Sequence, residues 1–387
     1  MKPSDFGLNK SGTLIKAPQG YWAFNPNPLP PPLSLTWELV SLISDADRAL
    51  SELAGVARTL PNPHLLISPF MRREAVLSSR IEGTQASLSD LFMFESSHTS
   101  ERKPDVQQVV NYINALEYGL SRLETLPVSS RLIREMHEHL MAGVRGEHLT
   151  PGEFRRTQNW IGRAGCSLTD ATFVPPPVHE MNVALTELER FLHEPSQLPP
   201  LLRLALVHYQ FEAIHPFLDG NGRIGRLLLT LLLLTEGLLP QPLLYLSAYF
   251  ERHREEYYAG LLGVSQHGKW MEWIDFFLQG VAIQARDAIR RSTLLQDLQK
   301  EYRSNLLDKR STATVLQLMD LLFMNPTLTV GFAKEHLGAT YRTAQISIDK
   351  LMEEGILFEV TGRSRNRIFM APRIMQIVEE SEPLADT

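Results

Sequence analysis

The sequence predicts a mostly α-helical protein with a small β-hairpin and a separate C-terminal domain of helices and strands. Apolar residues recur at helical spacing through most of the 387 residues. Glycines and prolines interrupt this pattern between residues 150 and 177, and two short alternating runs follow three helical stretches near the C-terminus. A hydrophobic fraction of 43% and a charged fraction of 21% are ordinary for a globular protein of two or three domains.

Net charge and cysteine content limit the possible partners and the cellular compartment of the protein. The formal net charge of −6 gives no overall basic surface, so contact with nucleic acid would need a local patch. Cys166 is the single cysteine, which excludes an internal disulfide and favours the cytoplasm. The N-terminus lacks the apolar segment of a signal peptide, and the longest mainly apolar run, 227–234, is too short for a membrane span. We therefore expect a cytoplasmic protein with no membrane partner.

Residues 1–103 are predicted to form an N-terminal strap and a helical region. The first 35 residues read as irregular, and five prolines between residues 26 and 32 favour an extended polyproline segment. This segment either packs its aromatic residues on the body of the protein or serves as a ligand for a domain of the SH3 type. From Leu35 onward, the apolar spacing predicts an amphipathic helix.

A second helix is predicted at about residues 69–83. Ser78 and Glu82 are four residues apart and therefore share one face, and Gly83 follows as a helix stop. On local grounds, Glu82 is an exposed carboxylate near a helix C-terminus, where the helix dipole slightly disfavours a negative charge.

Residues 105–145 are predicted to be helical and contain His137 and His139. Residues two apart on a helix diverge, and H-E-H lacks the H-E-x-x-H spacing of a zinc site, so both are interpreted as ordinary helix residues. Residues 150–177 then break the helical pattern, and the short runs N-W-I and T-F-V predict a small hairpin. The alternative is a surface loop without a special role.

The twelve residues from His215 to Arg226, H-P-F-L-D-G-N-G-R-I-G-R, lie between two predicted helices. The first helix covers about 200–213 and ends because Pro216 disfavours helical dihedral angles at His215. The second helix begins after Gly222 and is apolar nearly all round, which predicts that it is buried. Helical flanks argue against the hairpin that D-G-N-G would otherwise indicate.

This arrangement suits a polyphosphate. The first backbone N–H groups of a helix lack internal partners and carry a partial positive charge. Gly220 and Gly222 permit close approach of an anion, and the amide of Asn221 can donate to a phosphate oxygen. Arg223 and Arg226 lie on neighbouring faces of the first turn, where both guanidinium groups can bind phosphates.

Two further residues of the stretch supply chemistry. Asp219 is a hard oxygen ligand and suits a Mg²⁺ ion that bridges phosphate oxygens. His215 belongs to the residue type best able to remove a proton from an attacking hydroxyl near neutral pH. The stretch therefore predicts a group transfer that depends on a nucleotide.

The same stretch resembles the signature of Fic-domain proteins, H-x-F-x-[D/E]-G-N-G-R-x-x-R, at every fixed position. The resemblance implies a protein adenylyltransferase, which moves AMP from ATP to a Ser, Thr or Tyr hydroxyl of a target protein and releases pyrophosphate. It implies that His215 is the general base, that Asp219 holds Mg²⁺, and that residues 220–226 bind the phosphates of ATP. Phe217 would anchor the loop in the core.

The resemblance extends beyond the central stretch and implies a Fic core at 104–290. S-x-x-x-E-G at Ser78–Gly83 is similar to the inhibitory-helix motif of this family, in which Glu82 would pair with Arg226 in the place of the ATP γ-phosphate. Residues 150–177 resemble the Fic flap, whose open edge would bind the backbone of the protein substrate. Tyr258 would lie against the nucleoside, and Ser265 replaces an asparagine of some members.

The C-terminal part is predicted to be a winged-helix domain at 311–373. A closing helix at 273–290 and an exposed linker helix at 291–310 precede it. Three helices, at 312–324, 330–337 and 341–354, are followed by the strands I-L-F-E-V and R-I-F-M, and residues 374–387 read as an acidic tail.

The winged helix makes DNA a candidate partner. Arg363, Arg365 and Arg367 give a basic wing, and Arg342 and Lys350 lie on the third helix. The same helix carries Asp349, Glu353 and Glu354, and this fold also serves for protein docking or dimerisation. The alternative function is thus a transcription regulator in which nucleotide occupancy biases a homodimer between two states. Transfer of another phosphate-containing group is a further alternative.

Overall fold

The computed structural model describes residues 1–7, 11–59, 64–97, 104–144, 149–163, 165–363 and 365–380. The fold is mostly α-helical, as predicted, with short strands at the two ends of the chain. The helices are α1 Trp37–Thr59, α2 His64–Ile81, α3 Leu88–Ser97, α4 Pro104–Arg122, α5 Ser130–Met141, α6 Val178–His193, α7 Pro200–Ile214, α8 Asn221–Thr235, α9 Ser247–Arg252, α10 Arg254–His267, α11 Trp270–Asp308, α12 Ala313–Met324, α13 Val330–Leu337, α14 Tyr341–Glu353 and α15 Pro372–Glu379. The strands are β1 Gly12–Lys16, β2 Trp22–Pro26, β3 Thr327–Leu328, β4 Phe358–Glu359 and β5 Phe369–Met370.

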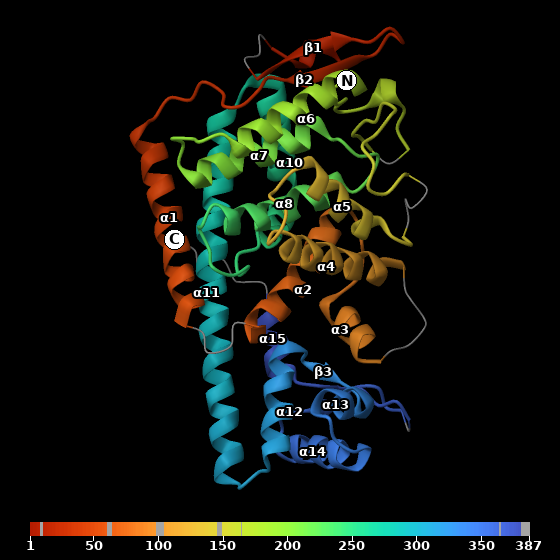
Figure 1. Ribbon diagram of the computed structural model, residues 1–387, viewed down its shortest axis with the longest axis vertical. Helices are drawn as coiled ribbons and strands as arrows, with labels where there is room; N and C mark the ends of the chain where they lie inside the picture. Colours follow the sequence, from red (N-terminus) through yellow and green to blue (C-terminus); the bar gives the residue numbers. More distant parts are fainter. Residues whose placement is uncertain are drawn as a thin grey trace.

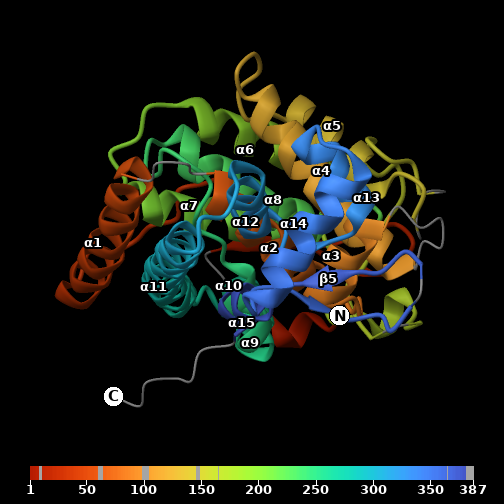
Figure 2. The same ribbon diagram turned by 90° about the horizontal axis from the view of Figure 1, so that it is seen from below.

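The molecule consists of a large helical body and a smaller C-terminal unit, both lying along α11 (Figure 1). Helix α1 packs beside α11 in both views, whereas the hairpin of β1 and β2 lies at the end of the body farthest from the C-terminal unit (Figure 1, Figure 2). Helices α7 and α8 are buried on nearly every face and form the centre of the body. The indole N–H of Trp273 on α11 donates to the carbonyl of Ala205 at 2.9 Å, which ties α11 to α7.

The sequence predicted that the first 35 residues are irregular, and this prediction was wrong for residues 12–26, which contain two strands. Strands β1 and β2 form an antiparallel hairpin in which Gly12 lies opposite Pro26 and Lys16 lies opposite Trp22. Phe24 is buried against the rings of Phe6 and Phe173. The strap does pack on the body, but it does so as a hairpin that covers α6 and α7.

The predicted flap hairpin is less regular than expected. Its two runs meet through a single antiparallel bridge, in which Ile161 N–H donates to the carbonyl of Phe173 at 2.8 Å and Phe173 N–H donates back at 3.0 Å. The rest of the described flap has turns, bends and one 3₁₀ helix at Leu168–Asp170 instead of strands. Glycines and prolines in the segment interrupt the extended conformation that a longer ladder needs.

The predicted linker at 291–310 and the predicted tail at 374–387 both required correction. Helix α11 continues without a break to Asp308, so the linker is the second half of one helix. Its Leu295, Leu298, Tyr302 and Leu306 are buried, at spacings of a helical stripe. Residues 372–379 form α15, which buries an apolar face; the remainder of the predicted tail, 381–387, lies outside the described residues.

The C-terminal unit contains helices α12, α13 and α14 and a three-stranded antiparallel sheet of order β3, β5, β4. The three helices and the two strands after them lie within a few residues of the expected bounds, but strand β3, between α12 and α13, was not predicted. The name winged helix for this unit stays a prediction. The unit packs on α2 and α3, where Ser68 Oγ donates to the carbonyl of Met324 at 3.1 Å and Ser96 Oγ lies 2.6 Å from Thr327 Oγ1.

None of the helices in the described part of the chain is long and apolar enough to cross a membrane.

Candidate nucleotide site at the amino end of helix 8

The loop between α7 and α8 has the geometry that the sequence predicted. Helix α7 ends at Ile214, and His215 takes a left-handed backbone conformation with φ of 50°. Gly220 has φ of 78°, a region that favours glycine, and α8 begins at the next residue. The unpaired N–H groups of the first turn of α8 therefore lie beside His215 in the chain.

Asn221 has a role that differs from the expected one. Its amide oxygen accepts from the N–H of Phe217 at 2.8 Å, and its amide nitrogen donates to the carbonyl of the same residue at 2.8 Å. The side chain is buried and closes the loop on itself. Asn221 therefore shapes the loop, and its backbone N–H is the group left for a phosphate.

His137 supports the loop from α5, a role that was not predicted. Its Nε2 lies 3.0 Å from the carbonyl of Asp219, and its Nδ1 accepts from the N–H of Gly152 at 2.9 Å. These partners require the neutral ring with the proton on Nε2. The ring also stacks on Phe217, with centroids 3.8 Å apart. Burial lowers the pKa of His137 to about 4, so the neutral form is present at physiological pH.

The flap fixes the backbone of His215. Its carbonyl accepts from Arg155 Nε and from Asn159 Nδ2, both at 3.0 Å. Asn159 also donates to the carbonyl of Phe217 at 2.8 Å, and Arg155 N–H donates to the carbonyl of Pro216 at 2.9 Å. Three successive residues of the loop are thus held by the start of the flap.

The imidazole of His215 is in the state that a general base requires. Nδ1 lies 3.2 Å from the carbonyl of Glu212, which assigns the ring proton to Nδ1 and leaves the Nε2 lone pair available. Burial lowers the pKa of His215 to about 4, while the hydrogen bond to the Glu212 carbonyl acts in the opposite direction. The ring is therefore neutral at physiological pH, with its single proton on Nδ1.

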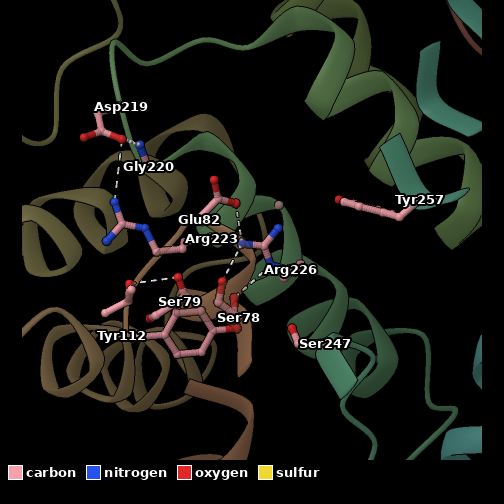
Figure 3. Close-up of polar contacts among 12 residues, drawn as sticks. Ser78, Ser79, Glu82, Tyr112, Asp219, Gly220, Arg223, Arg226, Ser247 and Tyr257 are labelled. Carbon is pink, nitrogen blue, oxygen red and sulfur yellow. Dashed lines mark hydrogen bonds and ion pairs between the residues drawn. The ribbon is translucent and has the colours of Figure 1, made fainter. Parts of the chain in front are cut away.

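Arg226 is the most strongly held side chain of the site (Figure 3). Its Nε donates to Ser78 Oγ at 2.8 Å, and its Nη2 donates to the Ser78 carbonyl at 3.0 Å and to Glu82 Oε1 at 2.6 Å. The arginine side chain is only 2% exposed, whereas that of Glu82 is 35% exposed. The last turn of α2 is thus attached to the second turn of α8.

Glu82 follows directly after α2 and lies over the amino end of α8. A Cβ at Gly222 would be 2.4 Å from its Oε1, so the absence of a side chain at that glycine creates the space for the carboxylate. Burial alone would raise the pKa of Glu82, but the charges of Arg226, Arg223 and His215 lower it below its ordinary value. The carboxylate is therefore ionised and occupies the anion-binding end of the helix.

Arg223 and Asp219 face each other across the loop (Figure 3). Arg223 Nη2 lies 3.7 Å from Asp219 Oδ1, and Arg223 is buried, with burial lowering its pKa. Asp219 is 45% exposed, and its Oδ1 accepts from the N–H of Gly220 at 2.6 Å. The described residues contain no group of three or more histidines, cysteines and carboxylates that could hold a metal ion by themselves. One exposed carboxylate does fit Mg²⁺ that takes its other ligands from phosphates and water.

Gly225 allows α7 and α8 to approach closely. A Cβ there would be 2.2 Å from Glu212 Oε1, and the Gly225 carbonyl lies 3.3 Å from Nδ1 of the buried His208. Burial raises the pKa of Glu212 to about 8, so this carboxyl is mostly protonated at neutral pH. His208 Nε2 in turn lies 2.9 Å from Tyr257 Oη.

Tyr257 and Tyr258 differ in burial, as expected for adjacent residues that lie on different faces of a helix. Tyr257 is buried in the aromatic core, whereas Tyr258 is 41% exposed beside the guanidinium of Arg254. Burial raises the pKa of Tyr258, and the charge of Glu82 acts in the same direction. Ser265 is buried and bonds to Tyr209 Oη at 3.0 Å, so it belongs to the core between α7 and α10.

Of the five lysine and arginine side chains expected to contact DNA, two interact with other side chains of the protein. Lys350 Nζ lies 3.4 Å from Glu353 and 2.7 Å from Glu354, and Arg367 donates to Gln345 at 3.5 Å. Arg342, Arg363 and Arg365 are exposed. The surface of α14 also exposes the apolar side chains of Tyr341 and Ile346. This surface is a mixture of charge and apolar groups.

Two family models match the chain in the region that carries this site. Residues 40–121 match the model described as Fic/DOC family N-terminal, and residues 127–233 match the model described as Fic/DOC family. The first match contains α2 with Ser78 and Glu82, and the second contains the loop from His215 to Arg226.

Curated relatives are similar over the same part. Protein adenylyltransferase Fic of Drosophila grimshawi is 34% identical over 133 residues, which are 34% of this chain and 24% of that protein. The protein of the same name from Drosophila willistoni is 35% identical with the same coverage. The chain thus spans about a quarter of the length of the curated relatives that it matches.

Solved structures share the fold. A Fic family protein from Desulfovibrio desulfuricans G20 superposes with a TM-score of 0.57 at 20% identity, over 89% of this chain and 98% of that chain. A fragment of Fic-1 from C. elegans superposes with a TM-score of 0.53 at 23% identity, over 67% of this chain and 74% of that chain. At these identities, the likeness concerns the fold.

Proposed function

Because the chain belongs to the Fic/DOC family, we propose that it is a protein adenylyltransferase. It would move AMP from ATP to a Ser, Thr or Tyr hydroxyl of a target protein, and of itself, with release of pyrophosphate. The observation that carries this proposal is the loop at the amino end of α8. There a neutral His215 with an available Nε2 lies on the loop that leads into α8, whose first N–H groups, Arg223 and Arg226 follow it.

The proposed reaction needs one base and an anion-binding surface. Nε2 of His215 takes the proton of the target hydroxyl, whose oxygen forms a bond to the α-phosphorus of ATP. The bond from that phosphorus to the oxygen bridging to the β-phosphate breaks, and pyrophosphate leaves. The N–H groups of α8 and the guanidinium of Arg223 hold the phosphates, so positioning and charge neutralisation provide most of the acceleration.

A divalent metal fits the residues present. Asp219 is an exposed, ionisable oxygen ligand next to the phosphate-binding turn, and Mg²⁺ typically needs only one or two protein carboxylates when phosphates supply further ligands. When bound, the ion would neutralise charge on the phosphates. We propose Asp219 as its protein ligand.

We also propose that the observed arrangement is self-inhibited. Glu82 and Ser78 occupy the donors of Arg226, and the Glu82 carboxylate stands over Gly222. A terminal phosphate of ATP carries the same charge as Glu82 and would compete for the same guanidinium. ATP would then bind in a pose unfit for transfer until α2 or its Glu82 moves.

The flap is the proposed docking place of the protein substrate. The described backbone of residues 159–163 and 165–174 forms one bridge and begins next to the carbonyl of His215. A substrate strand that pairs with this segment would bring its hydroxyl beside the base without demanding a particular sequence. Tyr258 is the proposed contact of the nucleoside.

The test is transfer of label to the purified protein from α-³²P-ATP and from γ-³²P-ATP. Wild type, Glu82→Gly and Glu82→Gly with His215→Ala would be compared. We expect label from the α position only, stronger in the single mutant and lost in the double mutant. Label from the γ position would indicate a kinase instead, and label that survives His215→Ala would refute the assigned base.

DNA binding by the C-terminal unit remains the alternative function. A nucleotide-sensing regulator would need DNA affinity that falls steeply with salt, since contacts to phosphates release counterions. Changing Arg363 and Arg365 to alanine tests the exposed part of the predicted wing. If neither DNA affinity nor its dependence on salt changes, this alternative is wrong.

A further inference from the structure

A cavity lies on the side of α2 that faces away from Arg226. Arg73, Leu77 and Arg80 line it from α2, at spacings of four and three residues that place them on one face of the helix. Ser78 and Glu82, which hold Arg226, point to a different side of the same helix. Helices α9 and α11 form the other walls.

The cavity is large enough for a small ion. Its volume is about 60 Å³, several times the roughly 10–15 Å³ that one water molecule requires. A neighbouring pocket shares part of this lining, namely Arg73, Leu77, Asp287 and Arg291, and is also lined by Glu74. The wall therefore extends from Arg80 near the end of α2 inward to α11.

Arginines outnumber carboxylates among the described residues that line this cavity. Its wall includes Arg73, Arg80, Arg252 and Arg291, against the carboxylates of Asp287 and Glu251. Asp287 is shared, since its oxygens lie 2.7 Å from Arg291 Nε, 3.1 Å from Arg290 Nη2 and 3.6 Å from Arg73 Nη1. Arg73 is the farthest of the three from this carboxylate.

Arg291 is fixed, whereas Arg73 and Arg80 have unused donors. Arg291 donates to Asp287 and to the carbonyls of Ile377, Val378 and Glu380. No hydrogen bond joins the guanidinium of Arg73 or Arg80 to a described residue, and their nearest carboxylates lie at 3.6 and 4.0 Å.

The poor compensation of Arg73 shows in its ionisation. Its side chain is only 18% exposed, and burial, reinforced by the charge of Arg291, lowers its pKa to about 10. A buried guanidinium without an accepting partner is unfavourable, and an anion in the cavity would remove that cost.

We propose that this cavity binds a phosphate group, either as the free ion or as the ester of a small phosphorylated molecule. Arg73 and Arg80 donate hydrogen bonds to the phosphate oxygens, and Arg291 contributes its charge from a fixed position. A tetrahedral anion with several acceptor oxygens matches two forked donors on one helix face. The site is separate from the loop of His215 and does not depend on the proposed transfer activity.

The test uses isothermal titration calorimetry of the full chain with inorganic phosphate and, separately, with ribose 5-phosphate. Arg73→Gln and Arg80→Gln remove the proposed donors. Arg286→Gln is the matched control, because Arg286 lies on α11, is half exposed and pairs with Asp45 outside the cavity. Arg223→Gln removes a cation of the central loop instead.

We expect binding of at least one of the two anions, weakened about tenfold by Arg73→Gln or Arg80→Gln, which is typical for loss of one charge-assisted hydrogen bond. Arg286→Gln and Arg223→Gln should leave the affinity unchanged. Tighter binding of ribose 5-phosphate would assign the site to an ester, and tighter binding of inorganic phosphate to the free ion. Absence of binding for both anions, equal affinity in Arg80→Gln and wild type, or loss of binding in Arg223→Gln would overturn the proposal.

Discussion

The carboxylate of Glu82 fills the space that a side chain on Gly222 would need. A Cβ at Gly222 would come within 2.4 Å of Glu82 Oε1 and 3.0 Å of Arg226 Nη1. The glycine therefore serves two different anions, since it admits the carboxylate in this state and would admit a phosphate when the carboxylate leaves. The two residues are expected to be energetically coupled.

Gly222→Ala should displace Glu82, because the flexible carboxylate moves more easily than the helix backbone. In wild type, Glu82→Ala should lower the free energy of unfolding by roughly 1–3 kcal/mol, the usual loss for a hydrogen bond to a charged group. In the Gly222→Ala background the same change should cost much less. A double-mutant cycle from denaturant unfolding measures this coupling. Glu272→Ala, which removes an exposed carboxylate, should have equal effects in both backgrounds; equal effects of Glu82→Ala would contradict the prediction.

Ser78→Ala should relieve inhibition only in part. It removes the hydroxyl that accepts from Arg226 Nε at 2.8 Å but keeps the Ser78 carbonyl and the Glu82 carboxylate. We expect AMP transfer faster than in wild type and slower than in Glu82→Gly. Initial rates with α-³²P-ATP check the order. Ser79→Ala is the control, because the buried Ser79 hydroxyl makes no hydrogen bond to a described residue. This change should leave the rate near that of wild type.

The acid limb of the pH profile should lie unusually low. The pKa of His215 is lowered to about 4, so its base form predominates at every pH well above 4. In Glu82→Gly, kcat/KM should be level between about pH 6 and 8 and fall tenfold per unit below the pKa, since this ratio reports the free enzyme. Brief single-turnover assays from pH 4.5 to 8 should therefore show no acid limb centred within this range. An acid limb centred near 6.5 would show that His215 is exposed and unperturbed.

His137→Phe should destabilise the loop although it preserves a ring against Phe217. The change leaves the Gly152 N–H and the Asp219 carbonyl without partners, which should cost roughly 1–3 kcal/mol and slow transfer. His139→Phe is a matched control two residues along the same helix, where the side chain is exposed.

The same substitution should change how stability depends on pH. Unfolded histidine has a pKa near 6.5, whereas His137 in the folded protein has a pKa of about 4, so the unfolded state binds more protons between these values. Stability from His137 is therefore present above pH 6.5 and lost as the pH falls toward 4. Thermal unfolding at pH 7 and pH 5 should show a smaller acid loss in His137→Phe than in His139→Phe.

Local signals allowed the sequence to predict the central loop. Pro216 sets the end of α7, and the glycines and the apolar run that follows set the start of α8. The role of His137 could not be predicted in this way, because its partner Asp219 is 82 residues away and H-E-H has no local pattern that indicates it. The same holds for Asn221, whose side chain could equally have faced a ligand.

The wrong predictions for α11, the N-terminal segment and the flap each have an identifiable cause. Leu295, Leu298, Tyr302 and Leu306 follow helical spacing and could have shown that α11 has a buried face beyond residue 290. The prediction for the N-terminal segment rested on the prolines of residues 26–32. It missed the alternating residues before them, which form β1 and β2. The flap has too few extended residues between its glycines and prolines to form a ladder, and propensity alone does not reveal that.

Helix α2 contacts both the helical body and the C-terminal unit. This affects how truncated forms of the protein would behave. One face of α2 packs on the C-terminal unit, and its last turn holds Arg226. A recombinant fragment cut at the end of α11 would leave an apolar stripe of α2 in contact with water, so a change in its activity could arise from a loosened helix instead of a missing domain. Single substitutions will therefore separate the roles of the two parts more clearly than truncation at a domain boundary.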